Sequence, residues 1–157
     1  RTLEIQRLIG RSLRTCVDRL VLGERQIIVD CDVIQADGGT RCASITGGWI
    51  ALKLASIYLL HNKIVKDDPI INHVAAISSG IFNESPILDL DYEEDSNINT
   101  DANFVFNENN EIIEIQVSAE KKPLSYKDFE DLFNISKKGV QELVSHQKKA
   151  ILSANFS

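Results

Sequence analysis

Residues 26–41, QIIVDCDVIQADGGTR, decide the fold, because a strand pattern and a helix start meet there. Side chains at positions 26–34 alternate between two faces, which is the period of a β-strand. The pair Gly38-Gly39 then breaks the strand. An apolar segment from about Cys42 to Leu60 follows, and it is apolar around enough of its circumference to predict a buried helix.

The remaining elements extend outward from this strand, turn and helix. Apolar residues spaced three and four apart predict a helix over residues 2–20, ended by Gly23, and another helix that opens at Ser125 with Asp128 as a capping pair and packs across a sheet. Alternating patterns predict further strands at 73–79 and 86–92 and a hairpin of 103–107 with 111–118. This order predicts an α+β fold in which helices are layered on a mixed sheet.

Length and composition favour a single folded domain. The chain has 157 residues, of which 43% are hydrophobic and 25% charged.

Its three cysteines have no CxxC spacing, so we expect reduced, buried thiols. The most apolar segment, 43–60, contains Gly47, Gly48 and Lys53, and no export signal precedes the first helix, so we expect no membrane association and a cytoplasmic location.

Charge is distributed unevenly along the chain. All seven arginines lie within residues 1–41, where six acidic residues leave a net charge of +1, while ten lysines and 17 acidic residues give 42–157 a net charge of -7. The guanidinium group grips phosphate or carboxylate bidentately, so the early segment is a candidate for handling an anion. Arg7, Arg11 and Arg14 form one stripe on the predicted helix, either as a solvated or subunit-contacting face or as an RNA contact.

The turn Asp37-Gly38-Gly39-Thr40-Arg41 is a candidate phosphate site. Glycines let backbone approach a ligand closely, the N–H groups at a helix start point outward, and Thr40 and Arg41 add a hydroxyl and a guanidinium. The alternative is a plain turn in which Thr40 caps the helix. Neither the Walker pattern nor the dinucleotide fingerprint is present in the sequence.

Acidic residues gather between Asp89 and Asp101. Clustered carboxylates bind Mg²⁺, or one of them becomes a general acid when repulsion raises its pKa. A solvated acidic loop is the alternative interpretation.

Several motifs, in order along the chain, resemble the ribonuclease PH family. They are RTLEIQRLIGR (1–11), LGER (22–25), DCDVIQADGGTR (30–41), ASITG (43–47), LDLDYEEDS (88–96) with Asp101, and EIQ (114–116) with Glu120. The resemblance implies the ribonuclease PH-like fold, also described as ribosomal protein S5 domain 2-like. It also implies that residues 1–157 are the C-terminal two-thirds of one domain. The absence of methionine and the helical pattern starting near Arg1 agree with a missing N-terminal segment that carries the first strands.

The resemblance implies a phosphate-dependent 3′–5′ exoribonuclease that trims precursor tRNA and other RNA and releases nucleoside diphosphates. Inorganic phosphate is then a co-substrate held by Arg1, Gly39, Thr40 and Arg41. Asp95 and Asp101 would be the catalytic pair, through bound Mg²⁺ or by protonating the leaving 3′ oxygen.

The implied partners are RNA and further copies of the chain, in a homohexamer built from dimers. Two alternatives stay open: a non-catalytic RNA-binding ring subunit, and a Mg²⁺-dependent hydrolytic nuclease that uses water through the acidic turn.

Overall fold

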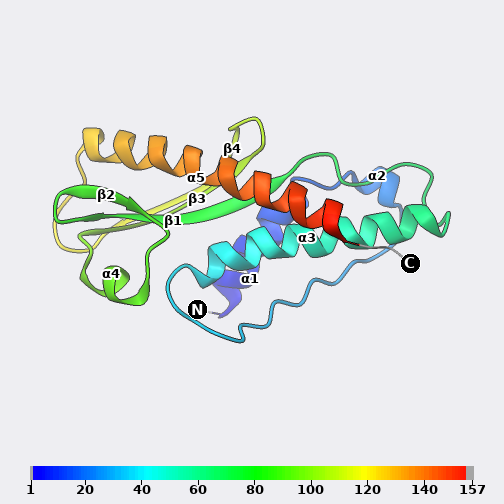
Figure 1. Ribbon diagram of the computed structural model, residues 1–157, viewed down its shortest axis with the longest axis horizontal. Coiled ribbons are helices and arrows are strands. Elements are labelled where there is room, and N and C mark those ends of the chain that lie inside the picture. Colours follow the sequence, from blue (N-terminus) through cyan, green and yellow to red (C-terminus); the bar gives the residue numbers. More distant parts are fainter. Residues whose placement is uncertain (1, 155–157) are drawn as a thin grey trace.

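The computed structural model describes residues 2–154 and is organised around a four-stranded sheet (Figure 1). Its strands are β1 (Val74–Phe82), β2 (Ser85–Leu88), β3 (Thr100–Asn107) and β4 (Ile112–Ala119), in the order β2-β1-β3-β4. The α+β class and the β3–β4 hairpin are confirmed. The sheet of the described residues is antiparallel at every pairing rather than mixed.

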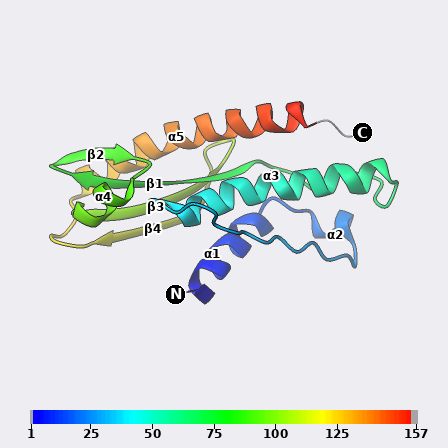
Figure 2. The ribbon, with the colours of Figure 1, turned by 60° about the horizontal axis from the view of Figure 1, so that its bottom comes forward.

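Helices cover both faces of the sheet, because its central strands carry apolar side chains in both directions. Helix α5 (Tyr126–Ser153) covers one face, and α1 (Thr2–Arg14) and α3 (Thr40–His61) cover the other (Figure 2). Successive side chains of β3 face opposite sides of the sheet. Phe104 and Phe106 pack on the α5 side, and Val105 packs with Trp49 of α3. This alternation fixes the register of the strand.

Helix α5 begins as the sequence predicts. The Ser125 hydroxyl accepts a hydrogen bond from the Asp128 N–H at 3.1 Å and donates one to the Asp128 carboxylate at 2.8 Å. In a standard capping box the acidic side chain would accept from the backbone N–H of the N-cap residue. Here the Asp128 carboxylate accepts from the Ser125 hydroxyl instead.

Helix α3 also matches its prediction and forms the centre of the second core. By length and composition alone it is apolar enough to cross a membrane, which the sequence reasoning did not expect. Here Ile45 and Trp49 are buried against the sheet and α1. Core helices of soluble proteins meet the same length and hydropathy test.

The first predicted helix is wrong in its extent. After α1 the chain leaves helical geometry at residues 15–18, where Val17 forms a β-bridge with Ile70, and it resumes as α2 (Arg19–Leu22). The Asp18 carboxylate caps α2 by accepting from the N–H groups of Leu20 and Val21. Gly23 ends α2 at a φ of 71°, as predicted for the end of this region.

Two strand predictions are also wrong. Residues 26–34 run alongside α3 without regular pairing: Ile27 and Val29 pack on the core, while Ile28 is 80% exposed and Ile34 is 96% exposed. The alternation is present, but within residues 2–154 no strand lies beside it to form a ladder.

The strand predicted at 86–92 ends at Leu88, because Asp91 caps α4 (Tyr92–Asn97) in a capping box with Glu94. All three cysteines are free thiols. Cys16 and Cys42 are buried as expected, and Cys31 is exposed.

Candidate active site

The site is built around the turn that leads into α3. Gly39 has a φ of 67° and is the N-cap of α3, with no side-chain hydrogen bond capping that end. The first N–H groups of an uncapped helix have no intrahelical acceptor and favour an anion. The alternative in which Thr40 caps the helix does not match this geometry, because Thr40 is already the first helical residue.

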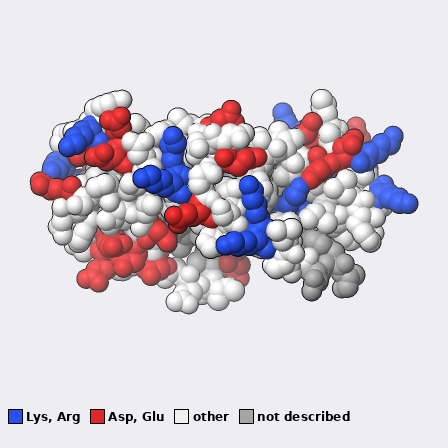
Figure 3. Space-filling model, turned by 45° about the horizontal axis from the view of Figure 1, so that its top comes forward, with Lys and Arg blue, Asp and Glu red and all other residues white. Residues whose placement is uncertain are grey.

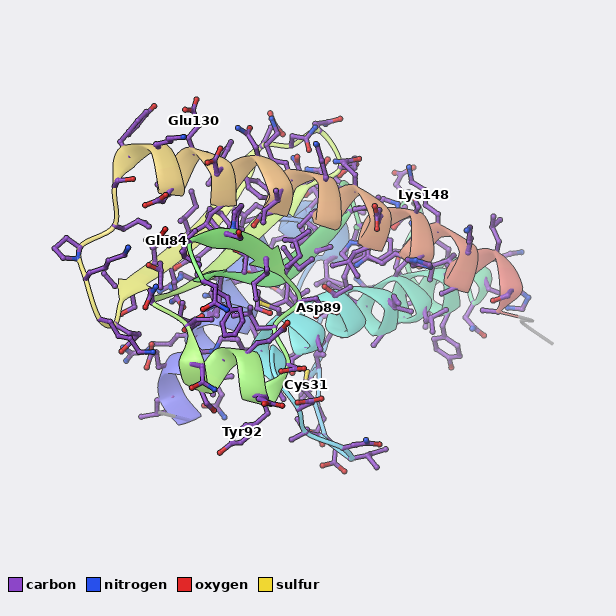
Figure 4. The ribbon with its side chains drawn as sticks, turned by 60° about the vertical axis from the view of Figure 1, so that its left-hand side comes forward. Cys31, Glu84, Asp89, Tyr92, Glu130 and Lys148 are labelled. Carbon is purple, nitrogen blue, oxygen red and sulfur yellow. The ribbon has the colours of Figure 1, made fainter. Side chains whose placement is uncertain are left out.

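The turn packs closely against the middle of β1 and the segment that follows β2. A Cβ atom on Gly38 would lie 1.7 Å from the Leu90 carbonyl oxygen, and one on Gly39 would lie 3.0 Å from the Ser78 hydroxyl. Asp89, which follows β2, lies beside the first turn of α3 (Figure 4). Only glycine therefore permits this approach between the turn and the strands.

Helix α4 is fixed next to the same turn. The Asp37 carboxylate accepts a hydrogen bond of 2.7 Å from the Tyr92 N–H, which joins the start of α4 to the turn. The first turn of α4 carries Glu93, Glu94 and Asp95. Acidic side chains accordingly gather at the α4 end of the molecule (Figure 3).

Two rows of residues across the sheet form the floor of the site. One row is Ser78, Asn103 and Gln116, and the next is Gly80, Asp101 and Ser118. All of them belong to the sheet face that α3 covers, because Asn103 bonds to Cys42 of that helix. Asp101 of the second row lies close enough to the first turn of α3 for its charge to act on Cys42 and for Arg41 to act on it.

Arg41, Asp95 and Asp101 are brought together here from α3, α4 and β3. Burial raises the pKa of Asp101, and the negative charge of Asp95 raises it further, while Arg41 opposes the increase. Glu120, just beyond β4, adds a smaller increase. The three groups are thus close enough to influence each other's charge. Gly39 and Thr40 adjoin them, and Arg1 lies outside the described residues.

The arginine stripe of α1 divides into two roles. Arg11 grips the Glu114 carboxylate of β4 through Nε at 3.2 Å and a terminal nitrogen at 2.7 Å, which fixes α1 against the sheet. Arg7 and Arg14 are exposed.

The carboxylates fit a cation that keeps much of its water shell. Among residues 2–154 no cluster of three or more His, Cys, Asp or Glu side chains has metal-ligand geometry. Mg²⁺ is commonly held by one or two carboxylates together with water and substrate phosphate. Asp95 and Asp101, whose mutual repulsion raises the pKa of Asp101, are the residues that would hold such an ion.

Sequence reasoning missed Asn103 and Cys42 as members of the site. Cys42 donates its thiol hydrogen to the Asn103 Oδ1 at 3.1 Å, and both side chains are buried. The available signal was the position of Asn103, two residues after Asp101 on the same face of a predicted strand.

We expect Gly38→Ala to destabilise the protein by about 1–3 kcal/mol, because the new Cβ must displace the turn from the Leu90 carbonyl. Urea unfolding measures the change. Gly47→Ala is the matched control: on α3 a Cβ there meets nothing within 4 Å, so the substitution should stabilise by up to about 1 kcal/mol. Equal stability of Gly38→Ala and the wild type would contradict the packing of the turn.

We expect Asp101→Asn to raise the melting temperature at pH 7. Because the folded pKa of Asp101 lies above its ordinary value of 3.8, ionisation of the carboxyl opposes folding. The penalty is full above the folded pKa, shrinks as the pH falls and is gone below the ordinary value. In thermal unfolding the stabilisation should therefore shrink as the pH falls toward 4 and be absent well below the ordinary value, whereas a gain independent of pH would contradict this cause.

Family models and curated relatives match this chain. A model described as "3′ exoribonuclease family, domain 1" matches residues 1–58, and "3′ exoribonuclease family, domain 2" matches residues 72–139. Proteins named "Ribonuclease PH" from Caulobacter vibrioides and Cereibacter sphaeroides are each 57% identical over 151 residues, which is 96% of this chain. The chain spans 63% and 64% of the length of those relatives.

A solved structure has the same fold. The archaeal exosome core superposes with a TM-score of 0.72 at 19% identity, over 93% of this chain and 63% of the other. The ribonuclease PH-like architecture is therefore confirmed. The prediction of a single domain over residues 1–157 stays a prediction.

Proposed function

The chain belongs to the 3′ exoribonuclease family and is 57% identical to a ribonuclease PH over 96% of its length, and we propose that the protein is a phosphate-dependent 3′–5′ exoribonuclease. The products would be nucleoside diphosphates, and precursor tRNA would be one substrate. One observation carries the proposal: Arg41 and Asp95 lie close enough to Asp101 to shift its pKa, beside the uncapped start of α3.

Orthophosphate must approach a phosphodiester that is also an anion. Two unit charges about 4 Å apart repel by roughly 4 kcal/mol at an effective dielectric constant near 20. The Arg41 guanidinium and the N–H groups after Gly39 would offset this repulsion, and the Thr40 hydroxyl would add a donor. Arg1 completes this proposed phosphate site. Catalysis of phosphoryl transfer rests mainly on such positioning and charge stabilisation.

The acidic pair, Asp95 and Asp101, would act on the leaving 3′ oxygen. The raised pKa of Asp101 brings this carboxyl closer to the working pH, which suits a group that passes a proton to the 3′ oxygen as the bond to phosphorus breaks. Asp95 would keep that pKa raised. In the alternative role of this pair, Mg²⁺ held by the ionised carboxylates of Asp95 and Asp101 would supply charge neutralisation at the phosphate oxygens.

Assembly and location belong to the proposal as well. The likeness to an exosome core supports a ring, and we propose a homohexamer built from dimers. We also propose a cytoplasmic location without membrane association. Light scattering of the full-length protein measures the number of subunits.

One assay tests the reaction class. The full-length protein is incubated with a tRNA precursor and Mg²⁺, with and without inorganic phosphate, and the released nucleotides are identified. Diphosphates that form only with phosphate support the proposal. Monophosphates formed without phosphate identify a hydrolytic nuclease, and binding without cleavage identifies a non-catalytic ring subunit.

A further inference from the structure

Asn103 is a buried polar side chain that has no role in the reaction proposed above. It lies on β3 two residues after Asp101 and faces α3, and only 5% of its surface is exposed. Its amide oxygen accepts from the Cys42 thiol. Within residues 2–154 the amide nitrogen has no protein acceptor, although it carries two hydrogens to donate. This nitrogen is not among the fully enclosed unpartnered atoms of the described residues, so it reaches solvent and is available to donate to a ligand.

Cys42 fixes which end of the amide is free. Burial raises the pKa of Cys42 to about 12, so the thiol keeps its hydrogen at neutral pH and acts as a donor. A donor thiol 3.1 Å away selects the oxygen of Asn103 and leaves the NH₂ group for another acceptor. Because Cys42 directly follows Arg41 on α3, this NH₂ group belongs to the region where the first turn of α3 meets the sheet.

We infer that Asn103, oriented by Cys42, donates a hydrogen bond to an oxygen of the phosphate that Thr40 and Arg41 hold. The inference rests on the proposed function for the identity of the ligand. A neutral donor suits this place, since Asp101 lies in the next row and a second fixed cation there would lower its pKa and oppose its role as an acid. Asn103 is thus a positioning residue for phosphate, donating from the sheet while Arg41 donates from α3.

The test uses the full-length protein and inorganic phosphate. For Asn103→Ala we expect the KM for phosphate to rise about 10-fold or more, with kcat and the KM for RNA changing by less than about 3-fold. Cys42→Ala should raise the same KM by a smaller factor, and Cys42→Ser should restore it, because a hydroxyl keeps the donor that orients the amide.

Asn107→Ala is the matched structural control. Asn107 is another 5% exposed asparagine on β3, but it bonds to the hairpin residues Asn109 and Glu111 at the far end of the strand. It should lower the melting temperature while the KM for phosphate stays unchanged. If Asn103→Ala and Asn107→Ala shift the two quantities alike, Asn103 is only structural and the inference is overturned.

Phosphate binding is also measured without catalysis, as the rise in melting temperature with added phosphate. If the wild type degrades RNA by phosphorolysis and Asn103→Ala keeps a normal KM and a normal phosphate shift, the inference fails while the proposed function stands. If phosphate stabilises the wild type but not Asn103→Ala, and RNA is not phosphorolysed, the function fails and the inference stands. A wild type that phosphate does not stabilise overturns the inference.

Discussion

Arg41→Ala should lower the rate of phosphorolysis by a factor on the order of 10³ or more while leaving the fold intact. Arg41 is in the first turn of α3, where its charge opposes the rise in the pKa of Asp101. Removing it takes away a bidentate donor for phosphate and leaves the acidic pair uncompensated. Diphosphate release under saturating RNA measures the rate, and circular dichroism measures the fold.

Two further variants sharpen this result. Arg41→Lys keeps the charge but not the planar fork, so it should recover only part of the lost rate. Arg19→Ala removes an exposed arginine on α2, which lies beside the C-terminal part of α3, and should leave the rate at the wild-type value. Near-normal diphosphate release by Arg41→Ala would refute the assignment of the phosphate site.

Asp101→Asn should reduce kcat by about 10²–10⁴-fold and change RNA affinity much less, because an amide cannot transfer the proton that the leaving oxygen needs. Single-turnover rates give the chemical step, and filter binding gives the affinity for RNA. Asp67→Asn, at an exposed position after α3, is the control and should have no effect on either. Equal losses of rate and affinity would count against a catalytic role for Asp101.

The pH profile gives an independent check on the acidic pair. Since Asp95 contributes to the raised pKa of Asp101, Asp95→Asn should move the limb of the kcat profile that reports Asp101 to lower pH. Removing a positive charge acts in the opposite sense, so residual activity in Arg41→Ala should show that limb at higher pH. A limb that stays in place in both variants would mean that another group titrates.

Local signals predicted the elements whose causes are local. The apolar length of α3, the Ser125 cap of α5 and the turn between β3 and β4 all depend on residues close together in the chain. The Gly-Gly turn was also identified, because its glycines permit close approach to a neighbour. That neighbour, the Leu90 carbonyl, lies more than 50 positions away and left no trace in the local pattern.

The predictions that were wrong or incomplete concern residues whose structure depends on partners distant in the sequence. Alternation at 26–34 predicted a strand, but a strand also needs a neighbour with which to exchange hydrogen bonds. Asn103 was missed for a similar reason: its importance comes from the Cys42 thiol on a helix 61 residues earlier. The acidic cluster from Asp89 to Asp101 was identified by composition, but Asp95 and Asp101 were singled out only through family resemblance, since α4, which carries Asp95, was not predicted.

The extended segment at 26–34 has a practical consequence for a polypeptide of these 157 residues. Its outward side carries Ile28 and Ile34, with Asp30 and Asp32 between them, beside backbone groups that no ladder engages among the described residues. Such an edge is a template for intermolecular β-sheet, and repulsion between the carboxylates of neighbouring copies is what opposes that pairing at neutral pH. Lysine at position 34, projecting from this edge, is the substitution that most directly blocks such stacking.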